Sequence, residues 1–213
     1  MSLPFIDVQA QYRAVKDEVD SRIRRVLDHG RFILGPEVAE LEEALADFCG
    51  VDHAVGLSSG TDALLAVLMA WDVGPGDAVF VPSFTFTASA EVILLLGAHP
   101  VFVDVRSDSF NMDAADLEAR IAQVKGEGRL TPKAVIAVDL FGLPADYEAL
   151  VPLCRRHDLK LMDDAAQAFG GRVGPRRIGS LADATATSDA DEPTMRATCR
   201  ALSDRGNANL TMQ

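Results

Sequence analysis

Hydrophobic positions recur every three or four residues at the start of this chain of 213 residues. The first such pattern, which includes Tyr12 and Ile23, predicts an amphipathic helix over residues 8–27. A second helix is predicted to begin at Pro36, because proline suits the first turn of a helix, and to end at Gly50. The stretch RFILGPEV interrupts the pattern between the two helices.

After residue 50, short apolar runs alternate with helical patterns. Strands are predicted over residues 53–58, 78–82, 100–105, 134–140 and 159–163, and helices over residues 60–71, 87–97, 113–124 and 145–157. Short, continuously apolar strands separated by helices are typical of a mostly parallel sheet that is buried on both faces. We therefore predict an α/β protein with a three-layer α/β/α fold.

The composition narrows the classes of function. A net charge of −12 argues against nucleic acid as a partner, because phosphate-backbone binding needs a basic face. The longest apolar runs are too short to span a bilayer and no signal peptide is visible, so we expect no membrane partner. Cys49, Cys154 and Cys199 form neither a metal-ligand pattern nor a disulfide framework. We expect reduced thiols in a cytoplasmic protein without a metal.

Ligands gather at the carboxyl ends of the strands in such a sheet. One candidate is SSGTDAL, which follows a predicted strand and opens a helix. The backbone N–H groups of Ser59, Gly60 and Thr61 would form an anion site there, especially for a phosphate. The alternative is a capped helix start with no ligand. The residues at the ends of all the predicted strands are 58–62, 82–87, Asp104, Asp139 and 163–167.

A second candidate is PSFTFTASA, which also follows a predicted strand. In an extended chain Phe84 and Phe86 would share one face, so one of the two rings could lie flat on a planar ligand. The alternative interpretation is that both rings belong to the hydrophobic core.

The third candidate is the pair of acids at the end of LKLMDDAAQAFGG. A carboxylate at a buried strand end is unfavourable unless something stabilises its charge, and a protonated pyridine nitrogen would do so. Pyridoxal phosphate (PLP) needs such a partner to act as an electron sink. Asp164 could hold the pyridinium, and Gln167 could donate to the phenolic oxygen of the ring. The alternative is that Asp163 or Asp164 simply caps the next helix.

Several motifs in this order resemble one family. SSGTDAL, PSFTFTASA, VDLFG and MDDAAQAFGG make residues 4–188 similar to the DegT/StrS family of PLP-dependent nucleotide-sugar aminotransferases, and most similar to its branch acting on UDP-linked 3-oxo sugars. The resemblance implies the large domain of a fold-type I PLP-dependent transferase. It also implies an enzyme that moves an amino group, commonly from glutamate, to a keto-sugar nucleotide for amino-sugar and polysaccharide biosynthesis. The family forms homodimers that share their active sites.

The resemblance assigns roles to individual residues. Gly60 and Thr61, with Ser59 beside them, match the turn that binds the cofactor phosphate, and Ser188 matches a serine that adds a hydroxyl to that phosphate. Phe86 matches the aromatic residue that stacks on the cofactor ring. Asp164 matches the catalytic partner of the pyridinium, and Gln167 matches the amide beside it.

The sequence departs from the family after Ser188. The family carries its Schiff-base lysine five residues beyond this serine, whereas here Pro193 stands there and no lysine follows Gln167. We interpret residues 1–188 as the N-terminal segment and PLP-binding large domain, and residues 189–213 as a discontinuous remainder with intervening loops missing. The family's small C-terminal domain is also missing. The alternative is a lysine-free, catalytically inactive relative that binds PLP or a sugar nucleotide without turnover.

We predict that the complete protein carries the lysine in a loop between Ser188 and Asp189. Family-like sequence resumes at Asp189, and a protein without PLP would have little reason to keep a buried carboxylate such as Asp164. Adding PLP and reducing with borohydride should yield a pyridoxyl-lysine, which mass spectrometry should find on a peptide from that loop. A coding sequence that joins Ser188 directly to Asp189 would contradict this prediction and favour the lysine-free alternative.

Overall fold

A parallel sheet of five strands is the centre of the fold in the computed structural model, which describes residues 7–188. Its strand order is β2-β1-β3-β4-β7, and every neighbouring pair is parallel. The strands are β1 (Asp77–Pro82), β2 (His99–Val103), β3 (Thr131–Val138), β4 (Lys160–Asp164) and β7 (Ala184–Ala186). The sheet predicted from the apolar runs is confirmed, and the short strand β7 is an addition to it. A small antiparallel hairpin, β5 (Arg172–Val173) and β6 (Arg176–Arg177), lies between β4 and β7 in the sequence.

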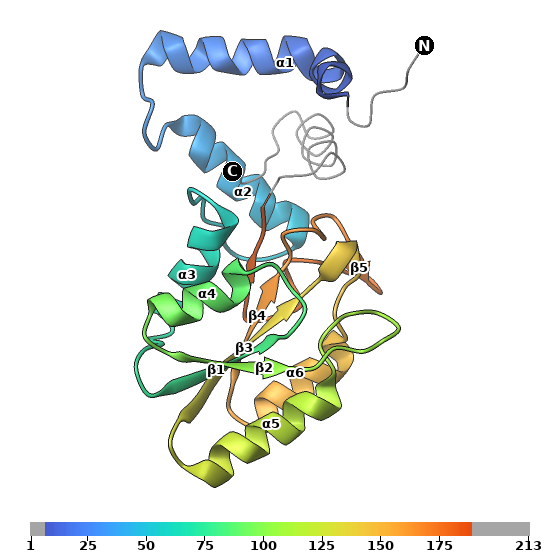
Figure 1. Cartoon of the computed structure of the whole chain (residues 1–213). Coiled ribbons are helices and arrows are strands. Elements are labelled where there is room, and N and C mark those ends of the chain that lie inside the picture. The colour runs from blue at the N-terminus through green and yellow to red at the C-terminus, as the bar shows by residue number, and fades with distance from the viewer. Residues whose placement is uncertain (1–6, 189–213) are drawn as a thin grey trace.

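Helices cover both faces of the sheet (Figure 1). Alternate residues of β1 point to opposite faces, so that Phe80 packs in one hydrophobic cluster and Val79 in the other. The cluster around Val79 includes residues of α3 (Gly60–Ala70) and α4 (Ala88–Leu95), and the cluster around Phe80 includes residues of α5 (Ala114–Glu127) and α6 (Tyr147–Arg156). The predicted three-layer α/β/α architecture is therefore confirmed.

One predicted strand is wrong. Residues 53–58 form no strand, and Val55 is 67% exposed. A strand needs a neighbour for its backbone hydrogen bonds, and within residues 7–188 no other strand pairs with this segment. A cavity of about 460 Å³ lies between this segment, the end of the second helix and β7, with Leu57, Cys49 and Ala184 in its wall. The prediction rested on the apolar pattern alone. The segment forms no strand because no neighbouring strand among the described residues is available to pair with it.

The two predicted N-terminal helices are present as α1 (Val8–His29) and α2 (Pro36–Cys49). The apolar face of α2 packs on the rest of the fold, where Leu45 is buried and the ring of Phe48 stacks on that of Phe169 at 5.2 Å between centroids. Helix α1 stands apart from the sheet in Figure 1 and has no buried residue. The predicted helix is confirmed, but nothing within the described residues buries its apolar face.

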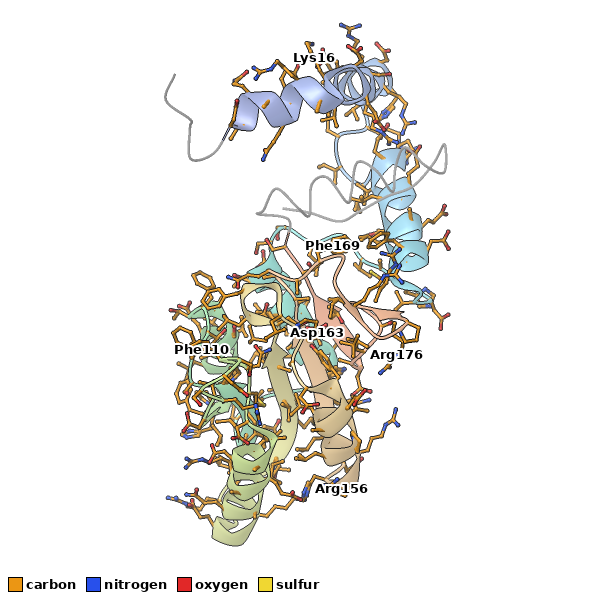
Figure 2. All side chains as sticks on the ribbon, turned by 90° about the vertical axis from the view of Figure 1, so that its right-hand side faces the viewer. Lys16, Phe110, Arg156, Asp163, Phe169 and Arg176 are labelled. Carbon is orange, nitrogen blue, oxygen red and sulfur yellow. The ribbon has the colours of Figure 1, made fainter. Side chains whose placement is uncertain are left out.

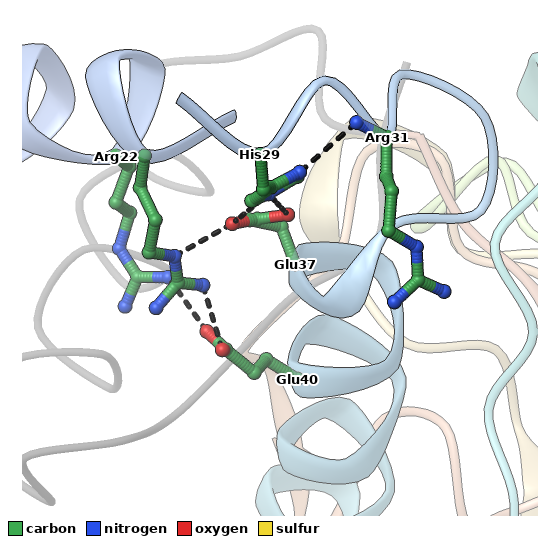
Figure 3. Close-up of polar contacts among 6 residues, drawn as sticks. Arg22, His29, Arg31, Glu37 and Glu40 are labelled. Atoms are coloured by element: carbon green, nitrogen blue, oxygen red, sulfur yellow. Dashed lines mark hydrogen bonds and ion pairs between the residues drawn. The ribbon is translucent and has the colours of Figure 1, made fainter. Parts of the chain in front are cut away.

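Ion pairs join α1 to α2 (Figure 3). Arg25 contacts Glu37 and Glu40 at 2.6 Å each, Arg22 contacts Glu40 at 3.3 Å, and His29 contacts Glu37 at 3.2 Å. Because these side chains are exposed to solvent, which screens their charges, each pair contributes little to stability. No helix within residues 7–188 is long and apolar enough to cross a membrane.

Candidate active site

The carboxyl ends of the parallel strands bring the predicted site residues to one edge of the sheet. Asp163 and Asp164 end β4, Ser188 follows β7, and the segment with Phe86 follows β1. Figure 2 shows Asp163 inside the body of the fold, far from Lys16 on α1.

Asp164 is a buried acid at this edge that accepts hydrogen bonds from two donors. It is 7% exposed, and its Oδ2 accepts a hydrogen bond of 2.7 Å from the hydroxyl of Ser89, while its Oδ1 accepts one of 3.4 Å from the N–H of Ala166. Burial raises the pKa of Asp164, and the bond from Ser89 acts in the opposite direction. Among the described residues no cationic side chain forms an ion pair with it. A bound cation would therefore find an oriented carboxylate here.

Sequence reasoning missed Ser89. This serine is 1% exposed in the first turn of α4, and its hydroxyl also contacts that of Thr85 at 2.9 Å. The only signal in the sequence is a pair of hydroxyl residues within the apolar stretch after β1. Nothing in the sequence indicates that they lie against Asp164, which is 75 positions away from Ser89.

The start of α3 is compatible with both alternatives from the sequence, a turn that binds a phosphate and a capped helix start. Ser59 caps the helix, because its Oγ accepts a hydrogen bond of 3.0 Å from the N–H of Asp62. Asp62 in turn accepts hydrogen bonds from the hydroxyls of Ser58 and Ser59, which lower its pKa. A Cβ added at Gly60 would lie 3.0 Å from the Cβ of Ser188, so glycine allows this close approach. The structure thus brings Gly60 and Ser188 together, and Thr61 follows in the same turn.

The aromatic residues after β1 are not core residues. Phe84 is 48% exposed and Phe86 is 74% exposed. Phe84 contacts the rings of Phe110 and Phe141 at 5.7 Å and 6.4 Å between centroids, whereas no ring contact involves Phe86 within the described residues. Phe86 is therefore the ring of the two that is free of ring contacts within the described residues, and its stacking on a cofactor stays a prediction.

Gln167 is exposed and has one fixed partner. Its Oε1 accepts a hydrogen bond of 2.7 Å from the N–H of Phe141, which lies in the 3-10 turn η1 (Leu140–Gly142) and has a left-handed backbone with φ 56°. The carbonyl end of the amide is thereby oriented, and its N–H₂ group is the end that could donate to a ligand.

The four lysines of the sequence lie away from this edge. Lys133 and Lys160 lie near the amino ends of β3 and β4, Lys125 lies on α5, and Lys16 lies on α1. The predicted lysine loop and the predicted discontinuous remainder, residues 189–213, lie outside the described residues. The residues that are described fit PLP, since they combine an oriented buried carboxylate, an exposed ring, an amide donor and a helix start.

Comparisons with known proteins agree with these motifs. Residues 13–197 match the model of the DegT/DnrJ/EryC1/StrS aminotransferase family. The chain is 44% identical over 188 residues to a UDP-2-acetamido-2-deoxy-3-oxo-D-glucuronate aminotransferase of Pseudomonas aeruginosa, covering 87% of this chain and 50% of that protein. It is 42% identical over 184 residues to a UDP-N-acetyl-3-dehydro-alpha-D-glucosamine 3-aminotransferase of Acidithiobacillus ferrooxidans, covering 85% of this chain and 47% of that protein.

The fold has solved counterparts. The crystal structure of a DegT DnrJ EryC1 StrS aminotransferase from Brucella abortus superimposes with a TM-score of 0.86 at 48% identity. That match covers 89% of this chain and 51% of the other. The chain spans about half the length of the curated relatives that it matches.

The hydrogen bond from Ser89 to Asp164 can be tested by stability measurements. Replacing Ser89 with alanine should destabilise the protein by about 1–3 kcal/mol at neutral pH, because a buried carboxylate loses its best donor. Burial already raises the pKa of Asp164 and loss of the donor raises it further, so the destabilisation should shrink as acid protonates this carboxyl. Denaturant unfolding at several pH values measures both effects.

The control for this prediction is Thr85→Ala, since Thr85 contacts the hydroxyl of Ser89 and not Asp164. It should cost less than Ser89→Ala and show a weaker dependence on pH. Equal losses in both variants, or a loss in Ser89→Ala that stays the same in acid, would contradict the assigned role of Ser89.

Proposed function

The chain belongs to the DegT/DnrJ/EryC1/StrS aminotransferase family, and from this we propose that the protein containing it is a PLP-dependent aminotransferase acting on a keto-sugar nucleotide. The family is PLP-dependent. The observation that carries the proposal is Asp164, a buried carboxylate at the ligand-binding edge of a parallel sheet that is oriented by Ser89 and forms no ion pair with any residue among 7–188.

We propose a UDP-linked 3-oxo sugar with a 2-acetamido group as the acceptor, and glutamate as the amino donor. Two relatives at 44% and 42% identity support this substrate class, one by its action on the 3-oxo uronate and the other on the 3-dehydro glucosamine. The product would be an amino sugar for polysaccharide biosynthesis. Free thiols at Cys49 and Cys154 support a cytoplasmic enzyme.

We propose that residues 1–188 form the N-terminal segment and the cofactor-binding large domain, and that residues 189–213 belong to the remainder of that domain. When bound, PLP would supply the electron sink that lets an amino group pass between an amino acid and a keto sugar.

The residues of this chain would bind the ring nitrogen, the ring oxygen, the phosphate and one face of the ring of the cofactor. Asp164 would accept a hydrogen bond from the protonated ring nitrogen, and the hydroxyl of Ser89 would keep the carboxylate of Asp164 in position. Gln167 would donate its amide N–H to the ring oxygen, since its own Oε1 is bound to Phe141. The N–H groups at the start of α3 and the hydroxyl of Ser188 would hold the phosphate, and Phe86 would cover one face of the ring.

The proton that moves during amino transfer needs a base close to the ring. No lysine of the described chain reaches this edge, so we assign this role to the lysine predicted between Ser188 and Asp189. Asp164 is not suited to this role, because its task is to remain charged beside the ring nitrogen.

The test is an amino-transfer assay on the full-length protein. With PLP, glutamate and either UDP-linked 3-oxo sugar, mass spectrometry should detect the aminated sugar nucleotide. Asp164→Asn should lower the rate about 10²–10⁴-fold, because loss of one partner of a buried charge pair costs about 3–5 kcal/mol. Asp163→Asn should cause a smaller loss. An active Asp164→Asn enzyme, or an equal loss in both variants, would refute the assignment of Asp164.

We also propose that the enzyme is a homodimer. Phe32, Ile33 and Leu34 between α1 and α2 are 70%, 86% and 73% exposed, and the apolar residues Ile23 and Leu27 of α1 are 54% and 62% exposed. Large apolar side chains that are exposed this close together in the sequence are typical of an interface. A second copy of the chain would cover it, as in the family that the sequence resembles.

Sedimentation tests the homodimer directly. Ile33→Glu should weaken dimerisation about tenfold or more, because a charge would enter the apolar part of the interface. The fold of the single chain should be unaffected, since Ile33 is exposed in it. The matched control is Ser21→Glu on the polar face of α1, which should leave the dimer intact. A wild-type protein that sediments as a stable monomer would refute the proposal.

A further inference from the structure

Three carboxyl groups lie within one buried part of the structure. Asp139 and Asp163 are 0% exposed, and Asp164 is 7% exposed. The N–H of Asp139 donates to the carbonyl of Asp164 at 3.1 Å, so the ends of β3 and β4 hold these acids side by side. Three negative charges in so small a dry volume would repel one another strongly. This repulsion favours a neutral form of at least one of these carboxyls in the folded protein.

The hydrogen-bond donors indicate which one is neutral. Oδ1 of Asp139 accepts hydrogen bonds from the N–H of Ala145 at 2.7 Å and from the hydroxyl of Tyr147 at 2.9 Å. Asp164 accepts the bonds from Ser89 and Ala166 described above. Asp163 receives only a long bond of 3.4 Å from the hydroxyl of Thr185. Its Oδ1 and the Oδ2 of Asp139 both have no partner among the described residues, but the other oxygen of Asp139 has its two short donors. Asp163 is therefore the least stabilised as an anion.

Tyr147 connects the two fully buried acids. It is 1% exposed at the start of α6, and its hydroxyl is within hydrogen-bonding reach of Asp163 as well as Asp139. A phenol has one proton, and here that proton is donated to Asp139. Toward Asp163 the hydroxyl can present only a lone pair, and a carboxylate gains nothing from a lone pair. A protonated Asp163 would instead supply the missing donor.

We propose that Asp163 is a neutral carboxylic acid at neutral pH, which donates its proton to the hydroxyl of Tyr147 while that hydroxyl donates to Asp139. The proton comes from solvent when the chain folds, and no bond other than one O–H bond is formed. This chain of hydrogen bonds joins the ends of β3 and β4 to the start of α6. It also leaves Asp164 as the charged carboxyl of β4, so Asp163 acts as a positioning residue.

The surroundings of Asp163 favour the neutral form. The groups that face it are Asp139 after β3, Asp164 beside it on β4, Tyr147 from α6, Thr185 from β7 and the thiol of Cys49 from α2. None of these groups is a cation. Burial and then the charge of Asp139 raise the pKa of Asp163 well above its usual range, and burial raises the pKa of Asp139 to about 6.

The direction of the pH dependence follows from these shifts. An acid with a raised pKa in the folded state binds more protons there than in the unfolded chain. Its contribution to stability is complete below the unfolded pKa of about 4 and is lost as the pH rises through the folded pKa. Asp163→Asn keeps a donor at this position without a charge, so the stability of this variant should decline less with rising pH than that of the wild type.

Infrared difference spectroscopy locates the proton on the full-length protein without cofactor or substrate. The wild type minus Asp163→Asn spectrum at neutral pH should contain the C=O stretch of a protonated carboxyl. Asp139→Asn should keep this band, because burial is the first cause of the raised pKa of Asp163. Tyr147→Phe should keep the band but shift it, because the acceptor of the proton is lost.

Two results would overturn the proposal. One is the absence of the band from the wild type at neutral pH. The other is a band that persists in Asp163→Asn and disappears in Asp139→Asn, which would place the proton on Asp139. If Asp163→Asn does not fold, the wild-type band and its shift in Tyr147→Phe decide the matter. Because no measurement uses PLP or a sugar nucleotide, failure of the proposed aminotransferase activity would leave this test unaffected.

Discussion

The need to stabilise carboxylates that are buried at one edge of a parallel sheet organises this protein. Parallel strands direct all their carboxyl ends to the same edge, and two neighbouring strands here deliver Asp139, Asp163 and Asp164 to it. These acids depend on donors from other elements, namely Ser89 of α4 for Asp164, and Ala145 just before α6 with Tyr147 of α6 for Asp139. The positions of these helices against the sheet therefore matter for charge as well as for packing.

The division of labour among the acids gives the site its chemistry. Asp164 accepts the Ser89 hydroxyl on one oxygen and forms no ion pair within the described part of the chain, so its charge is available to a cationic ligand. Asp163 points to the opposite face of β4, where Tyr147 and Thr185 lie. Adjacent acids with the same side chain thus acquire different roles, because a strand turns successive side chains to opposite faces.

The N-terminal helices depend on a different balance. Helix α2 is held by apolar contacts with Phe169, whereas α1 is joined to α2 by partly exposed ion pairs that contribute little each. Such pairs orient α1 relative to α2 but add little to the stability of the contact between the two helices. The apolar residues around Ile33 therefore stay exposed within a single chain. In the proposed homodimer, the second copy of the chain covers them.

The sequence by itself determined most of the alternation of strands and helices, the three-layer architecture, the helix start at Gly60 and the positions of Phe86, Asp164 and Gln167 at or after strand ends. Hydrophobic period and strand polarity are local properties, so the sequence carries them. Only the tertiary structure decided that residues 53–58 lack a strand partner. It alone also revealed that Ser89 binds Asp164 and that the N–H of Phe141 binds Gln167. Those contacts join residues 75 and 26 positions apart, and no local pattern encodes which distant donor reaches a buried acceptor.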